Sequence, residues 1–159
     1  MPYYVEGDVK LTQTLAILRH IAREHHLDGS NNQEKNDISL VEQQIYDMNR
    51  AIVQITYDPN CAKLQEDYIK GPLTDNLKLL QKFMHERAFV AGTNVSYVDF
   101  WTYEFLVKIR TLVPDVFNEF PVLVEYVERV ESLRAIMSYN KSHEPKTFNA
   151  SYAGWNGSF

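Results

Sequence analysis

The chain has 159 residues and a mass of 18.6 kDa, and its 45% hydrophobic and 23% charged residues exclude a mainly disordered, collagen-like or low-complexity protein. Sixteen basic against 21 acidic side chains give a net charge of −5, so nucleic acid is not an expected partner. No apolar run is long enough to cross a membrane, no signal peptide is recognisable, and the one cysteine, Cys61, has no disulfide partner, which together predict a cytoplasmic protein.

The first elements in the chain are a predicted β-hairpin and a helix. Short β-prone runs at residues 3–5 and 9–11 flank Gly7, which supplies the backbone conformation of a tight turn. Apolar residues at helical spacing follow, and Thr12 is the expected N-cap of that helix. A hairpin with one helix leaves a sheet edge uncovered, so we expect this N-terminal unit to be weakly supported.

A long helix opens the main unit. Residues 28–37 carry loop-forming side chains without periodicity, so we expect a linker between an N-terminal unit, residues 1–27, and a helical unit, residues 38–159. The helix after the linker has apolar residues in steps of three and four and ends before Pro59. This spacing creates one apolar seam, which faces either the core or a second subunit, and we expect different sectors of the helix pair to serve each use. The seam positions are Ile38, Val41, Ile45, Met48, Ile52 and Ile55.

Further helices complete the predicted helical unit. The next helical stretch is interrupted at residues 71–72, Gly-Pro, which predicts a kink or a break. Ser96 and Asp99 have the spacing of a capping box at the start of a largely apolar helix that we expect to be central. Pro121 occupies a helix-start position and introduces a helix expected to run through Ile136. The predicted fold class is therefore mainly α.

Few residues suggest chemistry by themselves. Phosphate-binding loops, dinucleotide fingerprints and zinc motifs are absent from the sequence, so no metal is expected. Gln13 and Thr14 open a helix directly after a strand, where free amides and the helix dipole favour a carboxylate or phosphate, although a simple cap is an alternative explanation. Asp47 flanks the apolar seam and faces either solvent or a partner subunit. Cys61 is either structural or a nucleophile activated by helix amides.

Several motifs resemble one known family. Residues 2–19, PYYVEGDVKLTQTLAILR, are similar to a stretch of the cytosolic glutathione transferases, most of all the mu class. The similarity continues through residues 91–92, 96–100 and 120–123 to Trp155. It implies the second half of a thioredoxin-like domain, a hairpin plus a helix, followed by the all-helical C-terminal domain, assembled as a homodimer. It also implies conjugation of glutathione, a co-substrate used without a further cofactor, to small hydrophobic electrophiles.

The resemblance assigns the glutathione site to four residues. Pro2 matches the cis-proline that presents its backbone to the cysteinyl part of glutathione. Gln13 and Thr14 match the pair that holds the γ-glutamyl carboxylate, with Thr14 replacing the usual serine but keeping the hydroxyl. Asp47 matches the acid that reaches the γ-glutamyl amine in the neighbouring subunit's site.

The resemblance also concerns the electrophile and the thiol. Tyr57 matches a tyrosine of the electrophile pocket, whereas Arg50 occupies a position of that pocket that is often apolar, which predicts an altered substrate preference. The chain begins at the family's cis-proline and has no counterpart of the tyrosine that activates the glutathione thiol, so no catalytic residue is assigned. We therefore expect the 159-residue chain alone to be nearly inactive. The alternative is a noncatalytic helical module for dimerisation or for binding hydrophobic ligands.

Overall fold

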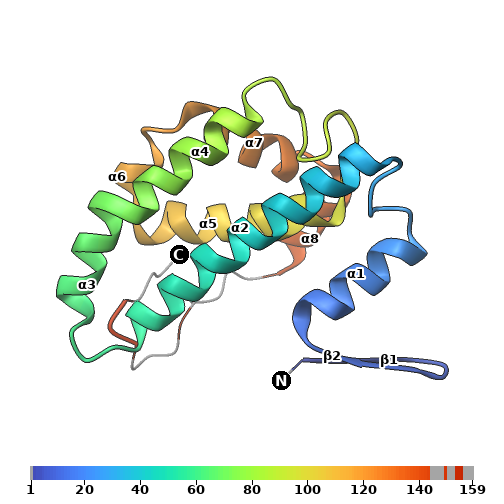
Figure 1. Ribbon diagram of the computed structural model, residues 1–159, viewed down its shortest axis with the longest axis horizontal. Coiled ribbons are helices and arrows are strands. Elements are labelled where there is room, and N and C mark those ends of the chain that lie inside the picture. Colours follow the sequence, from blue (N-terminus) through green and yellow to red (C-terminus); the bar gives the residue numbers. More distant parts are fainter. Residues whose placement is uncertain (1, 144–148, 150–152, 156–159) are drawn as a thin grey trace.

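The computed structural model describes residues 2–143, 149 and 153–155, and these residues form a mainly helical fold (Figure 1). A short hairpin precedes the helices, and a π-helical turn, η1, separates α3 from α4. No helix within this described part of the chain is both long enough and apolar enough to cross a membrane. The elements are β1 (Tyr3–Glu6), β2 (Val9–Thr12), α1 (Thr14–Glu24), α2 (Asn32–Thr56), α3 (Cys61–Tyr68), η1 (Ile69–Leu73), α4 (Thr74–Met84), α5 (Tyr97–Leu112), α6 (Pro114–Phe117), α7 (Pro121–Glu131) and α8 (Arg134–Ser142).

The hairpin lies where the sequence predicts it. β1 and β2 are antiparallel, with Tyr3 opposite Thr12, and Gly7 in the turn has a φ of 54°, which glycine adopts without steric cost. The expectation that Thr12 caps α1 is wrong, because Thr12 completes the strand pairing. The N-cap is Gln13 instead, and its φ of 72° turns the chain sharply from the strand into the helix.

α2 begins at Asn32, inside the segment expected to be a linker. Asn31 caps the helix, since its side-chain oxygen accepts a hydrogen bond from the Glu34 amide at 3.0 Å. Polar side chains hold the first turns, as in the 3.0 Å bond from Gln33 to Asp37. The loop expected for residues 32–37 is therefore wrong, because apolar spacing does not detect helical turns that polar contacts stabilise.

The apolar seam of α2 faces the core of the same chain. Five of its positions are at most 2% exposed, namely Ile38, Val41, Ile45, Met48 and Ile52. α2 packs against α3 and α5, and α7 packs against α4 and α5, so α5 lies centrally, as predicted (Figure 1). These five positions therefore serve the core, and the expected use of another sector for a subunit contact stays a prediction.

The break predicted at Gly71-Pro72 takes the form of η1. Pro72 has no N–H to donate, and the wider π-helical turn accommodates it without ending the rod of helix that joins α3 to α4. Thr74 Oγ1 donates to Ile69 O at 2.6 Å, and Asn76 Nδ2 donates to Pro72 O at 2.7 Å. Side chains thus satisfy carbonyls that the altered helix leaves open.

The helix expected from Pro121 through Ile136 is two helices. α7 ends at Glu131, and α8 begins at Arg134 after Leu133 adopts an extended ψ of 127°. The apolar spacing continues across this break because Leu133 and Ile136 both pack against the core. Periodicity alone therefore does not reveal the change of helix direction.

Asp99 anchors the start of α5. Its fully buried carboxylate accepts hydrogen bonds from Ser96 N and Oγ, both at 2.7 Å, and from Val90 N and Tyr126 Oη, both at 2.8 Å. The capping box of Ser96 and Asp99 is present. Burial, together with this carboxylate, raises the pKa of Tyr126 well above its usual value, so the tyrosine remains a donor.

Candidate functional site

The N-terminus of α1 is open to solvent. Gln13 and Thr14 are both exposed, and no side-chain hydrogen bond from the described residues caps the helix at Gln13. The first turn also contains no acidic residue within the described chain. The first amides and the positive end of the helix dipole are thus available to an anion. The alternative that these residues only cap α1 has no side-chain hydrogen bond to support it.

Pro2 lies at the same end of the hairpin as Gln13. Because Tyr3 pairs with Thr12, the residue before β1 and the residue after β2 lie at the same end of the sheet. Pro2 is exposed there. The peptide bond expected to be cis joins Pro2 to Met1, and Met1 lies outside the described residues, so the cis-proline stays a prediction.

Asp47, Arg50 and Tyr57 share one exposed stripe of α2 and its end. At about 100° per residue, the three positions fall within roughly 80° of one another, on the side of the helix opposite to the buried seam. Asp47 and Arg50 are exposed, and Tyr57 is 47% exposed. Asp47 accepts a 2.9 Å hydrogen bond from Gln43 on its own helix. Among the described residues, no hydrogen bond joins Asp47 to Gln13 or Thr14.

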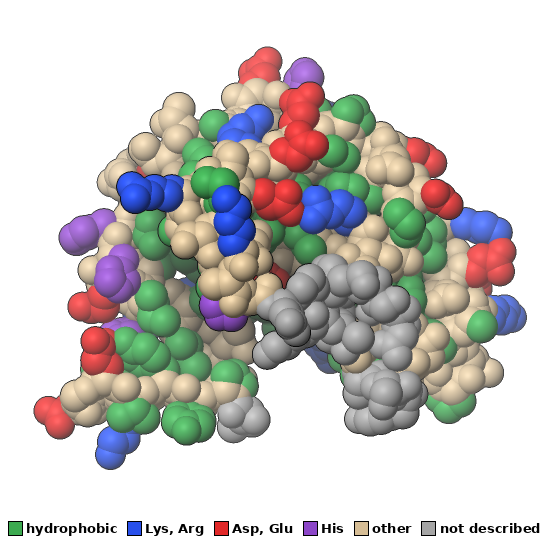
Figure 2. All heavy atoms as spheres, turned by 180° about the vertical axis from the view of Figure 1, so that it is seen from behind, with side chains coloured by type: hydrophobic (Ala, Val, Ile, Leu, Met, Phe, Trp, Pro, Cys, Tyr) green, Lys and Arg blue, Asp and Glu red, His purple; other side chains and the backbone are tan. Residues whose placement is uncertain are grey.

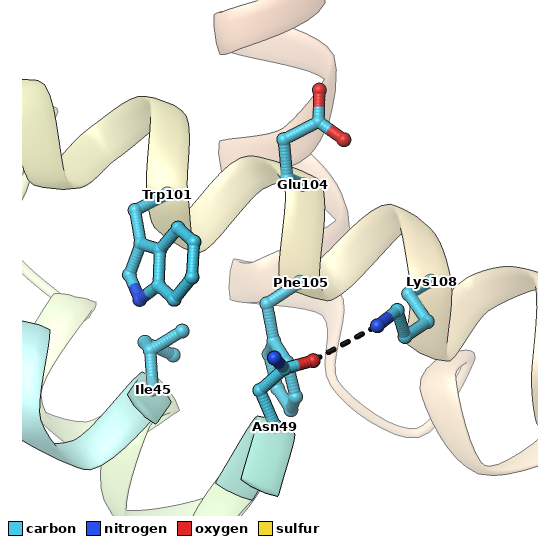
Figure 3. Close-up of a pocket in the computed structure, with 6 residues that line it drawn as sticks. All are labelled: Ile45, Asn49, Trp101, Glu104, Phe105 and Lys108. Carbon is cyan, nitrogen blue, oxygen red and sulfur yellow. Dashed lines mark hydrogen bonds between the residues drawn. The ribbon is translucent and has the colours of Figure 1, made fainter. Parts of the chain in front are cut away.

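A pocket of about 200 Å³ lies between α2 and α5 (Figure 3). Trp101 and Phe105 extend from α5 toward α2, and Lys108 Nζ donates to Asn49 Oδ1 at 2.9 Å across the gap. Partial burial raises the pKa of Glu104 and lowers that of Lys108. Trp101 Nε1 is buried without a hydrogen-bond partner in the described structure. The pocket thus combines apolar walls with a polar rim.

Comparison with known proteins identifies the family. Residues 46–143 match the family model described as "Glutathione S-transferase, C-terminal domain". The chain is 51% identical over 159 residues to a glutathione S-transferase of Dermatophagoides pteronyssinus, and the match covers all of this chain and 72% of that relative. The chain belongs to the glutathione S-transferases.

Mu-class relatives and solved structures agree with this assignment. The transferase is 36% identical over 159 residues to the class-mu 26 kDa isozyme 1 of Fasciola hepatica, covering all of this chain and 71% of the relative. The crystal structure of the glutathione S-transferase Blo t 8 superposes with a TM-score of 0.86 at 25% identity, over 96% of this chain and 74% of that one. A Pi-class enzyme of Onchocerca volvulus gives 0.82 at 26%, over 89% and 70%. The predicted family, its mu-class similarity, the enzyme class and the mainly α fold are confirmed.

Polar contacts that were not predicted from the sequence attach α1 of this transferase to α2 and α5. Arg19 Nε donates to both oxygens of Glu42, at 3.1 and 2.9 Å, and its Nη2 forms an ion pair with the same carboxylate. Tyr97 Oη donates to Glu42 at 2.8 Å, and Tyr97 N donates to Leu27 O at 3.0 Å. Glu42 is only 2% exposed. Burial, with the Glu42 carboxylate, raises the pKa of Tyr97.

The pocket between α2 and α5 was not predicted from the sequence either. Trp101 and Phe105 lie four residues apart on α5, as do Glu104 and Lys108, so an aromatic pair and a charged pair share one stretch of helix. The charged pair is the signal that distinguishes this side of α5 from a wholly apolar core helix. Because most residues of α5 are apolar, the helix was predicted to be central and this charged pair was not considered.

The two alternatives for Cys61 can now be compared. The thiol is buried at the start of α3, and burial, with a smaller contribution from Asp58, raises its pKa. A raised pKa keeps the thiol protonated near neutral pH and lowers its nucleophilicity. The structural role is therefore favoured over the nucleophile.

Proposed function

We propose that this transferase binds glutathione at the N-terminus of α1 and conjugates it to hydrophobic electrophiles. The observation that carries the proposal is the uncapped, exposed start of α1, with Gln13 in a left-handed conformation at the hairpin end that also carries Pro2. A carboxylate at this place accepts hydrogen bonds from free amides, from the Gln13 amide group and from the Thr14 hydroxyl. The γ-glutamyl end of glutathione supplies such a carboxylate, and membership of the family favours this ligand over other acids.

The proposal includes a homodimer. Asp47 offers an exposed carboxylate that suits the γ-glutamyl ammonium group, and the family resemblance favours the site of a second chain for it. Arg50 and Tyr57 lie on the same stripe of α2, so the proposed electrophile pocket adjoins the proposed subunit contact. The guanidinium of Arg50 favours electrophiles that carry partial negative charge near the apolar group.

Activation of the thiol is not assigned to a described residue. Tyr4 Oη donates to Glu6, and this bond raises the pKa of Tyr4, so its hydroxyl is already committed within the hairpin. Tyr3 is 80% exposed on the same strand. Neither supports a thiolate, and we expect slow conjugation by the 159-residue chain alone.

The test is the affinity of Gln13→Glu for glutathione, measured by isothermal titration calorimetry. Glutamate has nearly the same size as glutamine, and a negative charge at the start of a helix leaves α1 stable, but it repels the carboxylate of the ligand. We expect at least a tenfold loss of affinity, about 1.4 kcal/mol. Asn94→Asp, the same charge change at an exposed loop position, is the control and retains the wild-type affinity. Equal affinities of wild type and Gln13→Glu contradict the proposal.

A second candidate function is a noncatalytic module that binds hydrophobic ligands, favoured by the pocket between α2 and α5. An assay of glutathione conjugation to a chlorodinitrobenzene separates the two candidates. Glutathione affinity without conjugation above the uncatalysed rate supports the noncatalytic module. Turnover comparable with that of a relative such as the Dermatophagoides enzyme shows that a residue of this chain activates the thiol.

A further inference from the structure

The described residues near the C-terminus lie against the turn between α2 and α3. Gly154 N donates to the carbonyl oxygen of Thr56, the last residue of α2, at 2.9 Å. The next residue, Trp155, is buried in the hydrophobic core, and its carbonyl accepts a 2.7 Å hydrogen bond from Asn149 Nδ2. A backbone bond and a buried indole thus attach this segment to the rest of the fold.

The contact between Gly154 and Cys61 leaves no room for a side chain. A Cβ atom added at Gly154 would lie 2.7 Å from Cys61 Cβ and 3.0 Å from Cys61 Sγ. Cys61 Cβ is fixed to the first residue of α3, so a change of rotamer does not move it away. Glycine is required here because the Cys61 side chain lies so close to its backbone, not because of an unusual φ.

The same turn holds Tyr57. The Asp58 amide donates to Ile55 O at 3.1 Å, and the Cys61 amide donates to Asp58 O at 3.0 Å, so backbone hydrogen bonds within residues 55–61 stabilise the turn. Tyr57 lies within the first of these turns, residues 55–58, and directly after Thr56, which accepts the bond from Gly154. A displacement of the C-terminal residues therefore removes a hydrogen bond and a packing surface next to Tyr57.

We propose that Gly154 and Cys61 form a size-matched pair that docks residues 153–155 on the α2–α3 turn and thereby positions Tyr57. Gly154 is then a positioning residue for the apolar part of the substrate, a role that rests on the proposed electrophile pocket. Cys61 contributes its small side chain instead of its reactivity, which agrees with its burial. The segment and the turn form one surface only if neither residue is enlarged.

The test begins with Gly154→Ala, and Gly71→Ala is the matched control because a Cβ added at Gly71 meets no described atom within 4 Å. Cys61 is the single cysteine, so its alkylation by iodoacetamide, followed by mass spectrometry, reports directly on docking. We expect alkylation at least tenfold faster in Gly154→Ala, with the pKa of the thiol moving back toward its ordinary value as burial is lost. Gly71→Ala should react at the wild-type rate.

Ligand affinity reports on Tyr57. The ratio of the affinities for S-hexylglutathione and glutathione isolates the apolar pocket, and we expect this ratio to fall at least threefold in Gly154→Ala while glutathione affinity is kept. The double variant Cys61→Gly/Gly154→Ala restores the space, so it should recover both the affinity ratio and the tryptophan emission of wild type, with all variants compared in a Trp101→Phe background so that Trp155 alone emits. This rescue is not expected from a general loss of stability, which the second substitution does not repair.

The outcomes separate this inference from the proposed function. Unchanged alkylation of Cys61 in Gly154→Ala overturns the docking pair. Faster alkylation with an unchanged affinity ratio, or a double variant without rescue, overturns the positioning of Tyr57. If wild type binds neither ligand, the proposed function and the positioning role both fail, whereas the alkylation of Cys61 and the Trp155 emission in the Trp101→Phe background still decide whether the pair docks the segment.

Discussion

The helical region, α2 to α8, and the N-terminal region, residues 2–31, are stabilised by different kinds of contact. Of the buried hydrophobic side chains in the described structure, Ala22 alone belongs to the N-terminal region. Tyr3 and Val5 in β1 are 80% and 58% exposed, and Figure 2 shows hydrophobic side chains along the edge of the hairpin, at its lower left. The helical region thus depends on burial, and the N-terminal region on local turn geometry.

Polar contacts reinforce the junction between the two regions, where Leu18, Ala22 and Leu27 also pack with the core. Arg19 on α1 reaches Glu42 on α2, and Tyr97 on α5 bonds both to Glu42 and to Leu27 O. These few bonds fix the orientation of α1, which carries Gln13 at its first turn. The proposed glutathione site therefore lies on the less buried region, which these polar bonds and a small apolar contact attach to the helices.

The largest expected effect is a loss of stability of the helical region in the variant Asp99→Ala. The substitution removes the acceptor of four hydrogen bonds and leaves buried donors unpaired, which should lower the free energy of unfolding by about 3–5 kcal/mol. Urea denaturation followed by circular dichroism measures it. Asp67→Ala, at an exposed position of α3, is the control and should change stability by less than about 0.5 kcal/mol. Similar losses in both variants would show that the Asp99 network contributes little.

A smaller and regional effect is expected for Arg19→Ala. The variant leaves the Glu42 carboxylate buried with Tyr97 as its remaining donor, at a cost of about 1.5–3 kcal/mol. Hydrogen exchange should become faster in α1 and the hairpin but not in α5 and α7. Arg23→Ala, on the same helix and exposed, is the matched control. Uniformly faster exchange throughout the chain would contradict a separate N-terminal region.

Alkaline pH should weaken the helical region. Burial raises the pKa of Tyr68 to about 12 and also raises the pKa of Tyr97 and Tyr103, so the unfolded chain loses these protons first. Stability is therefore unaffected below pH 10 and falls as pH rises above it, by up to about 1.4 kcal/mol per pH unit for each tyrosine. Urea unfolding at several alkaline pH values measures the slope. Tyr68→Phe should reduce it, and Tyr46→Phe, at an exposed position, should not.

Much of the fold could be predicted because its signals are local. The hairpin depends on Gly7, the capping box on Ser96 and Asp99, and the buried seam on a helical spacing that a short window of sequence contains. Two predictions were wrong where contacts with distant residues determine the local structure. Thr12 pairs with a strand and not with the helix, and Leu133 turns the chain although the apolar spacing continues.

Part of the candidate site could also be predicted from local sequence, and part could not. The position of Gln13 and Thr14 at a helix start follows from local pattern, and so does the exposed stripe of Asp47 on α2. The ion pair of Arg19 and Glu42 spans 23 residues, and the bond of Tyr97 to Glu42 spans 55. Polar pairs so far apart leave no periodic trace in a single sequence, so the junction that orients the site could not be predicted.

The smallest expected effect tests how independent the hairpin is. Gly7 has a φ of 54° and open space around its Cα, so alanine there meets backbone strain of about 1 kcal/mol but no steric clash. Asparagine tolerates this conformation, so Gly7→Asn is the control and should lose less. Amides of β1 and β2 should exchange about fivefold faster in Gly7→Ala, as about 1 kcal/mol implies, while the urea midpoint of the helical region stays constant. A shift of that midpoint would instead show that the hairpin and the helices unfold as one cooperative unit, coupled through the contacts of α1 with α2 and α5.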